Sequence, residues 1–458
     1  MSSVKTLFEP KTVLLLGSSR IKEKVGLTSP WLFENVIYNV QKFFNGKTII
    51  YDVDGKAGSD NLEKLLEVPE LAVVMLPPKQ SITYVEKCAS LGVKVFIIIT
   101  GGYKDEQRQQ LLKVKDQHGV RILGPNTVMG VINTANGLNT TFERDLMPRK
   151  GNIAIISQSG GVGACLLDWA CRYKIGISKF AFMGDKIDVD DIDLLHYLAK
   201  DEETRVICLY MEGIKNGRKF IEEARKIIAE KPILALKGGI TQESAQRAKS
   251  HTASMAGSDE IFNAAFKKAG IIRVKDPEEL MNAAIALSKQ PPMFGDNIAI
   301  VSNVGGPAIL AADAVARNNL KLARLSDETK RKIESLYPGM DATNPIDMIA
   351  DARADRYEKV LNLVLADENV EGVLVINMLK SCFFEPEDAK IIPKVAAKYP
   401  NKPVVDVTAG GEDFELIYEA IGESNIPVYN LPEKGVKALK ILRAYGKILE
   451  KLGKPRKN

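Results

Sequence analysis

Two related stretches of sequence decide the fold. GNIAIISQSGGVGACLLDWA occupies residues 151–170, and DNIAIVSNVGGPAILAADAV occupies residues 296–315. Each passes from an apolar run through a Ser-x-x-Gly-Gly turn into helix-like apolar spacing, which predicts a strand, a turn and a helix. Chance similarity of two such units is the alternative, but the shared turn favours duplication. The positions identical at one constant offset are Asn152/Asn297, Ile153/Ile298, Ala154/Ala299, Ile155/Ile300, Ser157/Ser302, Gly160/Gly305, Gly161/Gly306 and Asp168/Asp313.

Short apolar runs alternate with longer helical patterns along the whole chain. Strands that are apolar on both faces and separated by helices predict parallel sheets covered on both sides. The expected fold class is α/β, with three Rossmann-like or flavodoxin-like domains at residues 1–130, 131–292 and 293–458. The predicted strands are 12–17, 47–53, 71–76, 93–100, 152–157, 206–212, 231–239, 297–302, 372–378 and 402–408, and a basic helix is predicted at 433–452.

The composition is that of an ordinary folded protein. The 458 residues are 45% hydrophobic and 26% charged, enough for two to four domains without disulfides or structural metals. The net charge of +5 is small for this length and gives no reason to expect nucleic acid as a partner. No run is long enough to cross a membrane and no signal peptide is recognisable, so a cytoplasmic protein is expected. The five cysteines form no Cys-x-x-Cys pair and are expected to be reduced core residues.

The two Ser-x-x-Gly-Gly turns are candidate phosphate sites. Glycine lets a ligand approach the backbone closely, and the following helix offers unbonded N–H groups and the positive end of its dipole. The turns at 157–163 and 302–308 could therefore aim two helix ends at one phosphate. For a single turn, glycine that serves only packing is the simpler interpretation.

His251 lies in a long polar stretch, GGITQESAQRAKSHTASMAGSDEIF, residues 238–262. Long loops in compact domains are often functional, although a surface histidine without a role is the alternative. The other two histidines, His118 and His196, lie in a charged turn and on an amphipathic helix, and we interpret them as surface residues.

Glu212 lies at the end of the predicted strand 206–212. Ligands of α/β proteins gather at the carboxyl ends of strands. A carboxylate there could accept a hydrogen bond from one imidazole nitrogen and leave the other as a nucleophile. An ordinary solvent-facing strand end is equally compatible with the sequence.

The first strand leads into LLLGSSRIKEKVG, residues 14–26. This turn has the position of a phosphate-binding turn but lacks the Gly-x-Gly-x-x-Gly spacing, so its signal for a nucleotide is weak. Asp52 and Asp54 after the second strand could contact an NAD ribose, but the missing glycine pattern counts against this role.

Four runs occur together in one order: GPNTVMGVIN (124–133), SQSGG (157–161), YMEGI (210–214) and SHTASMAGSDEIF (250–262). Together they resemble the acyl-CoA synthetases that form a nucleoside triphosphate from a diphosphate, relatives of the succinyl-CoA synthetase α subunit. The resemblance covers essentially the whole chain. In that family the first domain binds coenzyme A and the second carries a histidine that becomes phosphorylated. The third corresponds to the carboxy-terminal domain of the succinyl-CoA synthetase β subunit.

The resemblance implies that His251 is the phosphohistidine and that Glu212 is its carboxylate partner. It assigns no metal ligand to this chain. The residues implied to hold the phosphoryl group are Ser157, Ser159, Gly160, Gly161, Gly305 and Gly306. The residues implied to bind coenzyme A are Gly17, Ser18, Ser19, Arg20, Lys24, Val25, Gly26, Lys56, Leu76, Pro77, Thr100, Gly101 and Asn126, the last near the thioester.

The chain departs from the family pattern at three places. Asp54-Gly55 stands where the family often has Asn-Pro, and Ala253 stands where it has glycine. Asp185, in GDKIDV, stands where the family commonly has asparagine. These departures concern ligand details more than the reaction.

The implied enzyme is an acid–thiol ligase. It would interconvert acyl-CoA, ADP and phosphate with a carboxylic acid, ATP and coenzyme A through an acyl phosphate and a phosphohistidine. The chain contains no Walker motif, so ADP or ATP and Mg²⁺ are expected to bind mainly to an ATP-grasp β-subunit in an α2β2 assembly. The identity of the acyl group and the choice of ADP or GDP stay open.

Two alternative functions belong to other classes of protein, an acyl hydrolase and a non-enzymatic coenzyme A-binding protein. In an acyl hydrolase, Ser159 would be the nucleophile and His251 the base, but Ser157 stands where a nucleophile elbow needs glycine. In a non-enzymatic sensor or scaffold, the chain would only bind coenzyme A. The presence of His251 favours catalysis.

Overall fold

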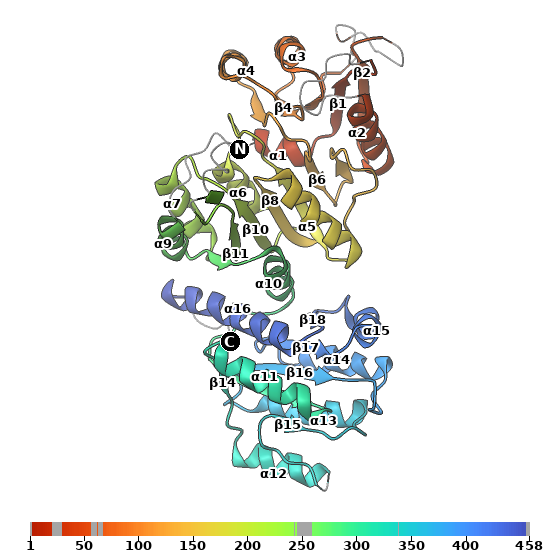
Figure 1. The fold of residues 1–458 in the computed structure, drawn as a ribbon, viewed down its shortest axis with the longest axis vertical. Helices are drawn as coiled ribbons and strands as arrows, with labels where there is room; N and C mark the ends of the chain where they lie inside the picture. Colours follow the sequence, from red (N-terminus) through yellow and green to blue (C-terminus); the bar gives the residue numbers. More distant parts are fainter. Residues whose placement is uncertain are drawn as a thin grey trace. The chain divides into compact units, whose positions relative to one another are not determined.

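A computed structural model of the chain describes residues 2–20, 30–55, 62, 67–241, 243–244, 259–337 and 339–454. The chain divides into two units, Met1–Leu280 and Met281–Asn458, and α10 (Pro277–Lys289) crosses the division. The first unit contains two sheets and the second contains one. All three sheets are mostly parallel, which confirms the predicted α/β class (Figure 1).

The first sheet of unit 1 has the strand order β2-β1-β3-β4-β5, and all its strands are parallel. Its strands are β1 (Thr12–Gly17), β2 (Lys47–Asp52), β3 (Leu71–Val74), β4 (Val95–Ile98) and β5 (Arg121–Leu123). The helices in this part of the chain are α1 (Ser2–Phe8), α2 (Pro30–Phe43), α3 (Pro78–Ser90) and α4 (Asp105–His118). The order reverses between β1 and β3, so the carboxyl ends of these two strands frame the crevice in which such sheets bind ligands.

The second sheet of unit 1 has the order β12-β11-β10-β8-β9-β6-β7, in which β6 and β7 are antiparallel. Its strands are β6 (Val131–Asn133), β7 (Leu138–Asn139), β8 (Lys150–Ser157), β9 (Ile177–Phe182), β10 (Val206–Met211), β11 (Ile233–Lys237) and β12 (Ile272–Val274). The helices are α5 (Gly160–Arg172), α6 (Asp191–Lys200), α7 (Gly217–Ile227) and α9 (Asp259–Ala269). Here the order reverses between β8 and β10.

Unit 2 repeats the arrangement with the order β14-β13-β16-β17-β18, and β15 pairs with β13. Its strands are β13 (Asn297–Ser302), β14 (Lys321–Leu322), β15 (Ile346–Asp347), β16 (Gly372–Asn377), β17 (Val404–Thr408) and β18 (Val428–Tyr429). The helices are α11 (Gly305–Arg317), α12 (Asp327–Leu336), α13 (Ala354–Ala366), η2 (Pro386–Lys390), α14 (Ile391–Ala396), α15 (Glu412–Ile421) and α16 (Pro432–Lys451). The reversal lies between β13 and β16.

The strands form where the sequence is apolar on both faces. Every residue of β1, β3, β4, β11, β16 and β17 is buried, as expected for central strands of a sheet covered on both sides. The predicted strands at 12–17 and 297–302 have the bounds of β1 and β13. None of the described helices is long and apolar enough to cross a membrane.

The expectation that the cysteines are core residues is wrong in part. Cys88 and Cys208 are buried, but Cys165 is exposed and Cys171 and Cys382 are half-buried, and all five are reduced. Cys165 precedes the buried Leu166 and Leu167 on α5, so it falls on the solvent side of an amphipathic helix.

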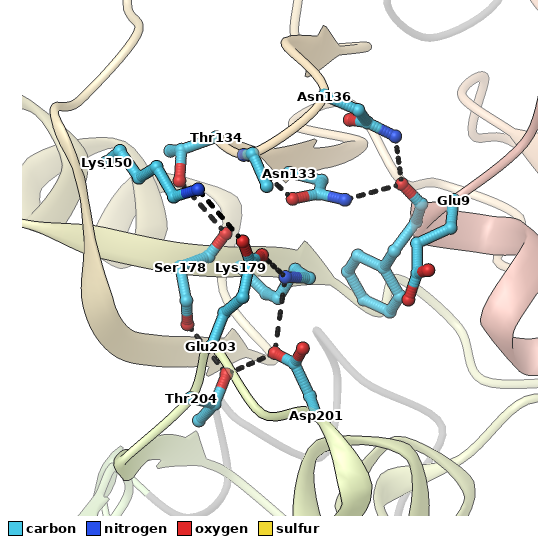
Figure 2. Close-up of polar contacts among 12 residues, drawn as sticks. Glu9, Asn133, Thr134, Asn136, Lys150, Ser178, Lys179, Asp201, Glu203 and Thr204 are labelled. Carbon is cyan, nitrogen blue, oxygen red and sulfur yellow. Dashed lines mark hydrogen bonds and ion pairs between the residues drawn. The ribbon is translucent and has the colours of Figure 1, made fainter.

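Lys179 is a buried cation in the middle of β9. Its Nζ lies 2.8 Å from Glu203 Oε2 and 3.2 Å from Asp201 Oδ2, and its side chain is 2% exposed (Figure 2). Thr204 Oγ1 donates to Asp201 at 2.6 Å, and Lys150 pairs with Glu203 at 3.1 Å. The network satisfies the charges that the fold buries between β9 and the segment before β10.

Replacing Lys179 with methionine is expected to destabilise the protein by about 3–5 kcal/mol, because the buried carboxylate of Asp201 loses its counter-charge. Urea unfolding of the variant and the wild type measures the difference. The double variant Lys179→Met/Asp201→Asn should recover much of the loss, since no unbalanced charge remains. A loss below about 1 kcal/mol in the single variant would contradict the structural role of this pair.

Candidate functional site

The predicted phosphate turn of unit 1 lies where the second sheet reverses. Ser157 ends β8, and its Oγ donates to Ser159 O at 2.7 Å and accepts from Ser159 N at 3.2 Å. Ser159 caps α5 by accepting from Val162 N at 3.4 Å. A Cβ at Gly161 would meet no atom within 4 Å, so packing does not require glycine there. The turn therefore presents open backbone at a helix N-terminus.

The same turn is built a second time in unit 2. Ser302 Oγ donates to Val304 O at 2.7 Å and accepts from Val304 N at 3.1 Å. The helix that follows begins at Gly305, and a Cβ at Gly306 would meet no atom within 4 Å. Two equivalent turns with open glycines count against the interpretation that these glycines serve packing alone.

A carboxamide next to each turn was missed by the sequence analysis. Gln158 Oε1 accepts from Glu212 N at 2.7 Å and from Gly213 N at 3.0 Å, and its Nε2 donates to Gly213 O at 2.9 Å. In unit 2, Asn303 Oδ1 accepts from Met378 N at 3.1 Å and its Nδ2 donates to Met378 O at 3.0 Å. The shared carboxamide, Gln158 and Asn303 at the offset of the repeat, was the signal that could have revealed this pairing.

Glu212 lies beside the first turn and is not a solvent-facing strand end. It follows β10, the strand next to β8 across the reversal, and is 7% exposed. Tyr210 Oη donates to Glu212 Oε1 at 3.3 Å. The structure thus brings Glu212 and the Ser157–Gly161 turn together at one sheet edge through the Gln158 amide.

Lys237, another residue that the sequence analysis missed, ends the neighbouring strand β11. Its ammonium lies 4.6 Å from the ring centroid of Phe262 on α9. Burial lowers the pKa of Lys237, while the charges of Asp259 and Glu212 oppose that shift. A cation at this edge suits an anionic ligand. His251 lies outside the described residues, in the stretch between β11 and α9.

The predicted coenzyme A turn follows β1 in the first sheet. A Cβ at Gly17 would lie 2.2 Å from the ring of Phe33 on α2, so only glycine fits there. The Ser18 hydroxyl bonds Asp54, and Asp52 Oδ1 accepts from Ser19 N at 3.2 Å and Asp54 N at 3.0 Å. Asp52 therefore holds the two loops together, which explains the acidic residues without an NAD ribose. Arg20 is exposed beside this turn, and Lys24, Val25, Gly26 and Lys56 lie outside the described residues.

The other predicted coenzyme A residues meet at the same edge of the first sheet. Thr100 Oγ1 donates to Leu76 O at 2.6 Å, and Asn126 N donates to Thr100 O at 2.8 Å. A Cβ at Gly101 would lie 2.6 Å from Asn126 Oδ1. Leu76, Pro77, Thr100, Gly101 and Asn126 are thus gathered at the carboxyl ends of β3, β4 and β5.

Ser159 does not have the geometry of a hydrolase nucleophile. Its φ of −121° and ψ of 126° are ordinary extended backbone, not the strained turn of a nucleophile elbow. Its hydroxyl is the N-cap of α5.

A polar cavity of about 940 Å³ lies elsewhere in unit 1, lined by residues of α1, α6 and the segment before β10. His196 in its wall pairs with Glu223 at 2.8 Å, and Arg121 pairs with Asp193 at 2.7 Å. Because charged side chains in its wall are engaged in these ion pairs, we interpret the cavity as a polar contact region between α1 and the part of unit 1 that contains the second sheet.

Comparison with known proteins agrees with this architecture. Residues 150–287 match the family described as succinyl-CoA ligase like flavodoxin domain, residues 47–133 match the CoA binding domain, and residues 298–447 match the ligase-CoA domain. Together the three matches define a CoA-ligase architecture.

Individual relatives are more specific. The α subunit of an ADP-forming acetate–CoA ligase of Pyrococcus furiosus is 35% identical, and the alignment covers 97% of this chain and 98% of that subunit. A longer ADP-forming acetate–CoA ligase of Archaeoglobus fulgidus is also 35% identical, but this chain spans only 64% of its length. A structure of acetyl-coenzyme A synthetase 1 of Ca. Korarchaeum cryptofilum with phosphate and ADP matches with a TM-score of 0.87, 30% identity and 99% of both chains covered. The chain belongs to the family of ADP-forming acetate–CoA ligases, and its extent corresponds to the α subunit.

Proposed function

We propose that this chain is the α subunit of an ADP-forming acyl-CoA synthetase. The enzyme interconverts acyl-CoA, ADP and phosphate with a carboxylic acid, ATP and coenzyme A. The observation that carries the proposal is the position of buried Glu212 beside the open Ser157–Gly161 turn, at the reversal of the second sheet. A carboxylate and an anion-binding turn at one edge are what a phosphorylated histidine requires.

The proposed reaction has three reversible steps. A phosphate oxygen attacks the thioester carbonyl, and the coenzyme A thiolate leaves, which forms an acyl phosphate. An imidazole nitrogen of His251 then attacks phosphorus, and the carboxylate leaves. Phosphohistidine finally passes the phosphoryl group to ADP. Backbone N–H groups of Gly160 and Gly161 stabilise the charge that develops on the phosphoryl oxygens, and Gly305–Gly306 is an anion-binding turn of the same kind.

Coenzyme A is proposed to bind at the first sheet, in the crevice where its order reverses between β1 and β3. The residues involved are the thirteen implied by the family resemblance, nine of which are described. Those nine lie at the carboxyl edge of this sheet, in the turn after β1 and in the loops after β3, β4 and β5. Asn126, which also contacts the Asp185 loop, is proposed to lie at the thioester end of the cofactor.

A partner chain is proposed to supply the nucleotide site. Relatives of this length are named α subunits, and the Archaeoglobus relative contains further sequence. We expect an ATP-grasp β-subunit that binds ADP or ATP with Mg²⁺, and an α2β2 assembly in the cytoplasm.

The test is incorporation of labelled phosphate from inorganic phosphate and a series of acyl-CoA thioesters, with and without the partner chain. The expected label is acid-labile, base-stable and confined to the tryptic peptide 250–267, in which His251 is the only histidine. The thioester that supports labelling names the acyl group, and chase with ADP or GDP names the nucleotide. No label with any thioester, while coenzyme A still binds, would overturn the proposal in favour of a coenzyme A sensor or scaffold.

A further inference from the structure

One loop of unit 1, residues 184–190, contacts both the first sheet and the second. Asp185 N donates to Pro125 O at 2.8 Å and Ile187 N donates to Gly124 O at 3.1 Å, so the loop follows the Gly-Pro-Asn turn. Arg108 Nη2 donates to Asp185 Oδ2 at 2.8 Å. The loop therefore lies against the proposed thioester end of the coenzyme A site.

The side chain of Lys186, in the same loop, points away from the Gly-Pro-Asn turn and toward the second sheet. Its Nζ donates to Asp191 Oδ2 at 3.0 Å and to Gly213 O at 3.1 Å. Asp191 Oδ1 accepts from Gln158 Nε2 at 2.8 Å, next to the phosphate turn. Lys186 and Asp191 side chains are each 5% exposed. One buried chain of contacts thus runs from the coenzyme A half to Gln158 and the backbone after Glu212.

The conformation of Lys186 is unusual. Its φ is +52°, a left-handed conformation that residues other than glycine rarely adopt. Such strain persists where surrounding contacts enforce it, and it concentrates at functional sites. Here the ion pair with Asp191 is among the contacts that hold Lys186 in this conformation.

The equivalent turn in unit 2 shows that a strand end can be fixed beside such a turn without an ion pair like that of Lys186 and Asp191. Asn303 pairs with the backbone of Met378 as Gln158 pairs with Gly213, and within the described residues its amide makes only these two bonds. The reciprocal amide pairing therefore suffices to fix a strand end beside such a turn. The Lys186–Asp191 pair adds a link between this edge and the loop that contacts Gly124 and Pro125.

We infer that Lys186 is a positioning residue for the acyl-transfer half of the reaction, an inference that rests on the proposed function. Through Asp191 and Gly213 it holds the thioester end of coenzyme A and the phosphate turn at a fixed separation. Attack of phosphate on the thioester needs both sites in register, because reacting groups must meet at near-attack distance. Phosphoryl exchange between His251 and the nucleotide uses the phosphate turn without the coenzyme A half.

The two halves can be measured separately in the complex of this chain with its β-subunit. One assay labels the chain from inorganic phosphate and acetyl-CoA, or the thioester found to be active, and the other labels it from γ-labelled ATP. Lys186→Met is expected to slow labelling from the thioester by about 10²-fold, the cost of misplacing reacting groups by roughly 1 Å. Labelling from ATP and the dissociation constant of coenzyme A should stay within about 3-fold of the wild type, a change of under 1 kcal/mol.

Lys179→Met is the matched control, because it removes another buried, ion-paired lysine of unit 1, away from the proposed site. It should lower stability but leave the ratio of the two labelling rates unchanged. Should Lys186→Met fold poorly, Lys186→Met/Asp191→Asn removes the link without leaving a buried unbalanced charge, and the same ratio is read. Equal losses in both assays, or no loss in either, would overturn the inference. A wild-type complex unlabelled by both routes would overturn the proposed function itself, and the inference with it.

Discussion

Substituting Glu212 with glutamine is expected to slow phosphorylation of the chain by about 10³-fold, within the range for loss of a positioned acid–base group. In the proposed site the carboxylate accepts the N–H of one imidazole nitrogen of His251 and leaves the other as the nucleophile. Glutamine keeps the size of the side chain but loses its charge, so it no longer stabilises the cationic ring that forms during transfer. Labelling from inorganic phosphate and acyl-CoA measures the rate.

Two variants calibrate this prediction. Tyr210→Phe removes the hydroxyl that donates to Glu212 Oε1 at 3.3 Å and should cost much less than the loss of the carboxylate itself. His251→Ala removes the residue that accepts the phosphoryl group, so its rate gives the background of the assay. Because Glu212 is buried and glutamine is neutral, the variant should fold, which circular dichroism checks. A Glu212→Gln rate within about 3-fold of the wild type would exclude the proposed carboxylate–histidine pair, since that is under 1 kcal/mol.

The predictable part of the fold is the part in which local sequence and burial agree. β1 and β13 carry almost uninterrupted apolar side chains because both faces of the sheet are covered, and their predicted and observed bounds coincide. The repeat around Ser157 and Ser302 also identified two equivalent turns, since an identical Ser-x-x-Gly-Gly pattern dictates the same local hydrogen bonds.

The strand β9 was missed because a lysine stands in its middle. Lys179 breaks the apolar run, yet it is buried, since Asp201 and Glu203 supply its counter-charges from more than twenty residues away. Compensation of this kind is a tertiary property that a local pattern does not encode. The antiparallel strands β6 and β7 are only three and two residues long, which is too short for a period to be recognised.

The residues of the candidate site also fall into two groups, those that the local sequence indicated and those that it did not. Turn glycines and Glu212 were recognisable from their places after strands, but Gln158, Lys186 and Lys237 act through contacts with distant backbone or rings. Lys186 adopts a left-handed backbone conformation that the sequence GDKIDV does not predict, because lysine has no preference for this conformation. Two signals were present in the sequence: a carboxamide in both copies of the repeat, and the departure from the family pattern at Asp185. Both can be interpreted only from the contacts that these residues make in the folded chain.

Replacing Asp406 with asparagine is expected to make the stability of unit 2 less dependent on pH. Asp406 is fully buried in β17, and burial raises the pKa of its carboxyl to about 7, with hydrogen bonds from Thr408 and Asn377 lowering it only in part. Thr408 Oγ1 lies 2.8 Å from Asn377 Oδ1 and 3.2 Å from Asp406 Oδ2. A hydroxyl carries one hydrogen, which Thr408 shares between Asn377 and Asp406, so the buried carboxyl receives only one unshared hydrogen bond, from Asn377 Nδ2 to Asp406 Oδ1 at 2.6 Å.

The direction of the effect follows from proton binding. Above the ordinary pKa of 3.8 the unfolded chain has lost the Asp406 proton, whereas the folded chain keeps it up to about pH 7. The contribution of Asp406 to the unfolding free energy is therefore greatest at low pH, declines as pH rises and levels off above the folded pKa. Between about pH 5 and 7 the wild type should lose about 2 kcal/mol relative to Asp406→Asn, at up to about 1.36 kcal/mol for each unit of pH. Urea unfolding of both proteins across this range measures the difference.

Asp296→Asn is the control with the opposite titration. Burial raises the pKa of Asp296, but its bonds with Arg443 and Lys447 outweigh burial and leave that pKa below the ordinary value. Its stabilising contribution is complete above the ordinary pKa and is lost only as pH falls further. The stability difference between Asp296→Asn and the wild type should therefore stay constant from about pH 5 to 8, while that of Asp406→Asn changes. Parallel pH profiles for Asp406→Asn and the wild type would mean that Asp406 already folds as a carboxylate, with its charge stabilised by Asn377 and Thr408.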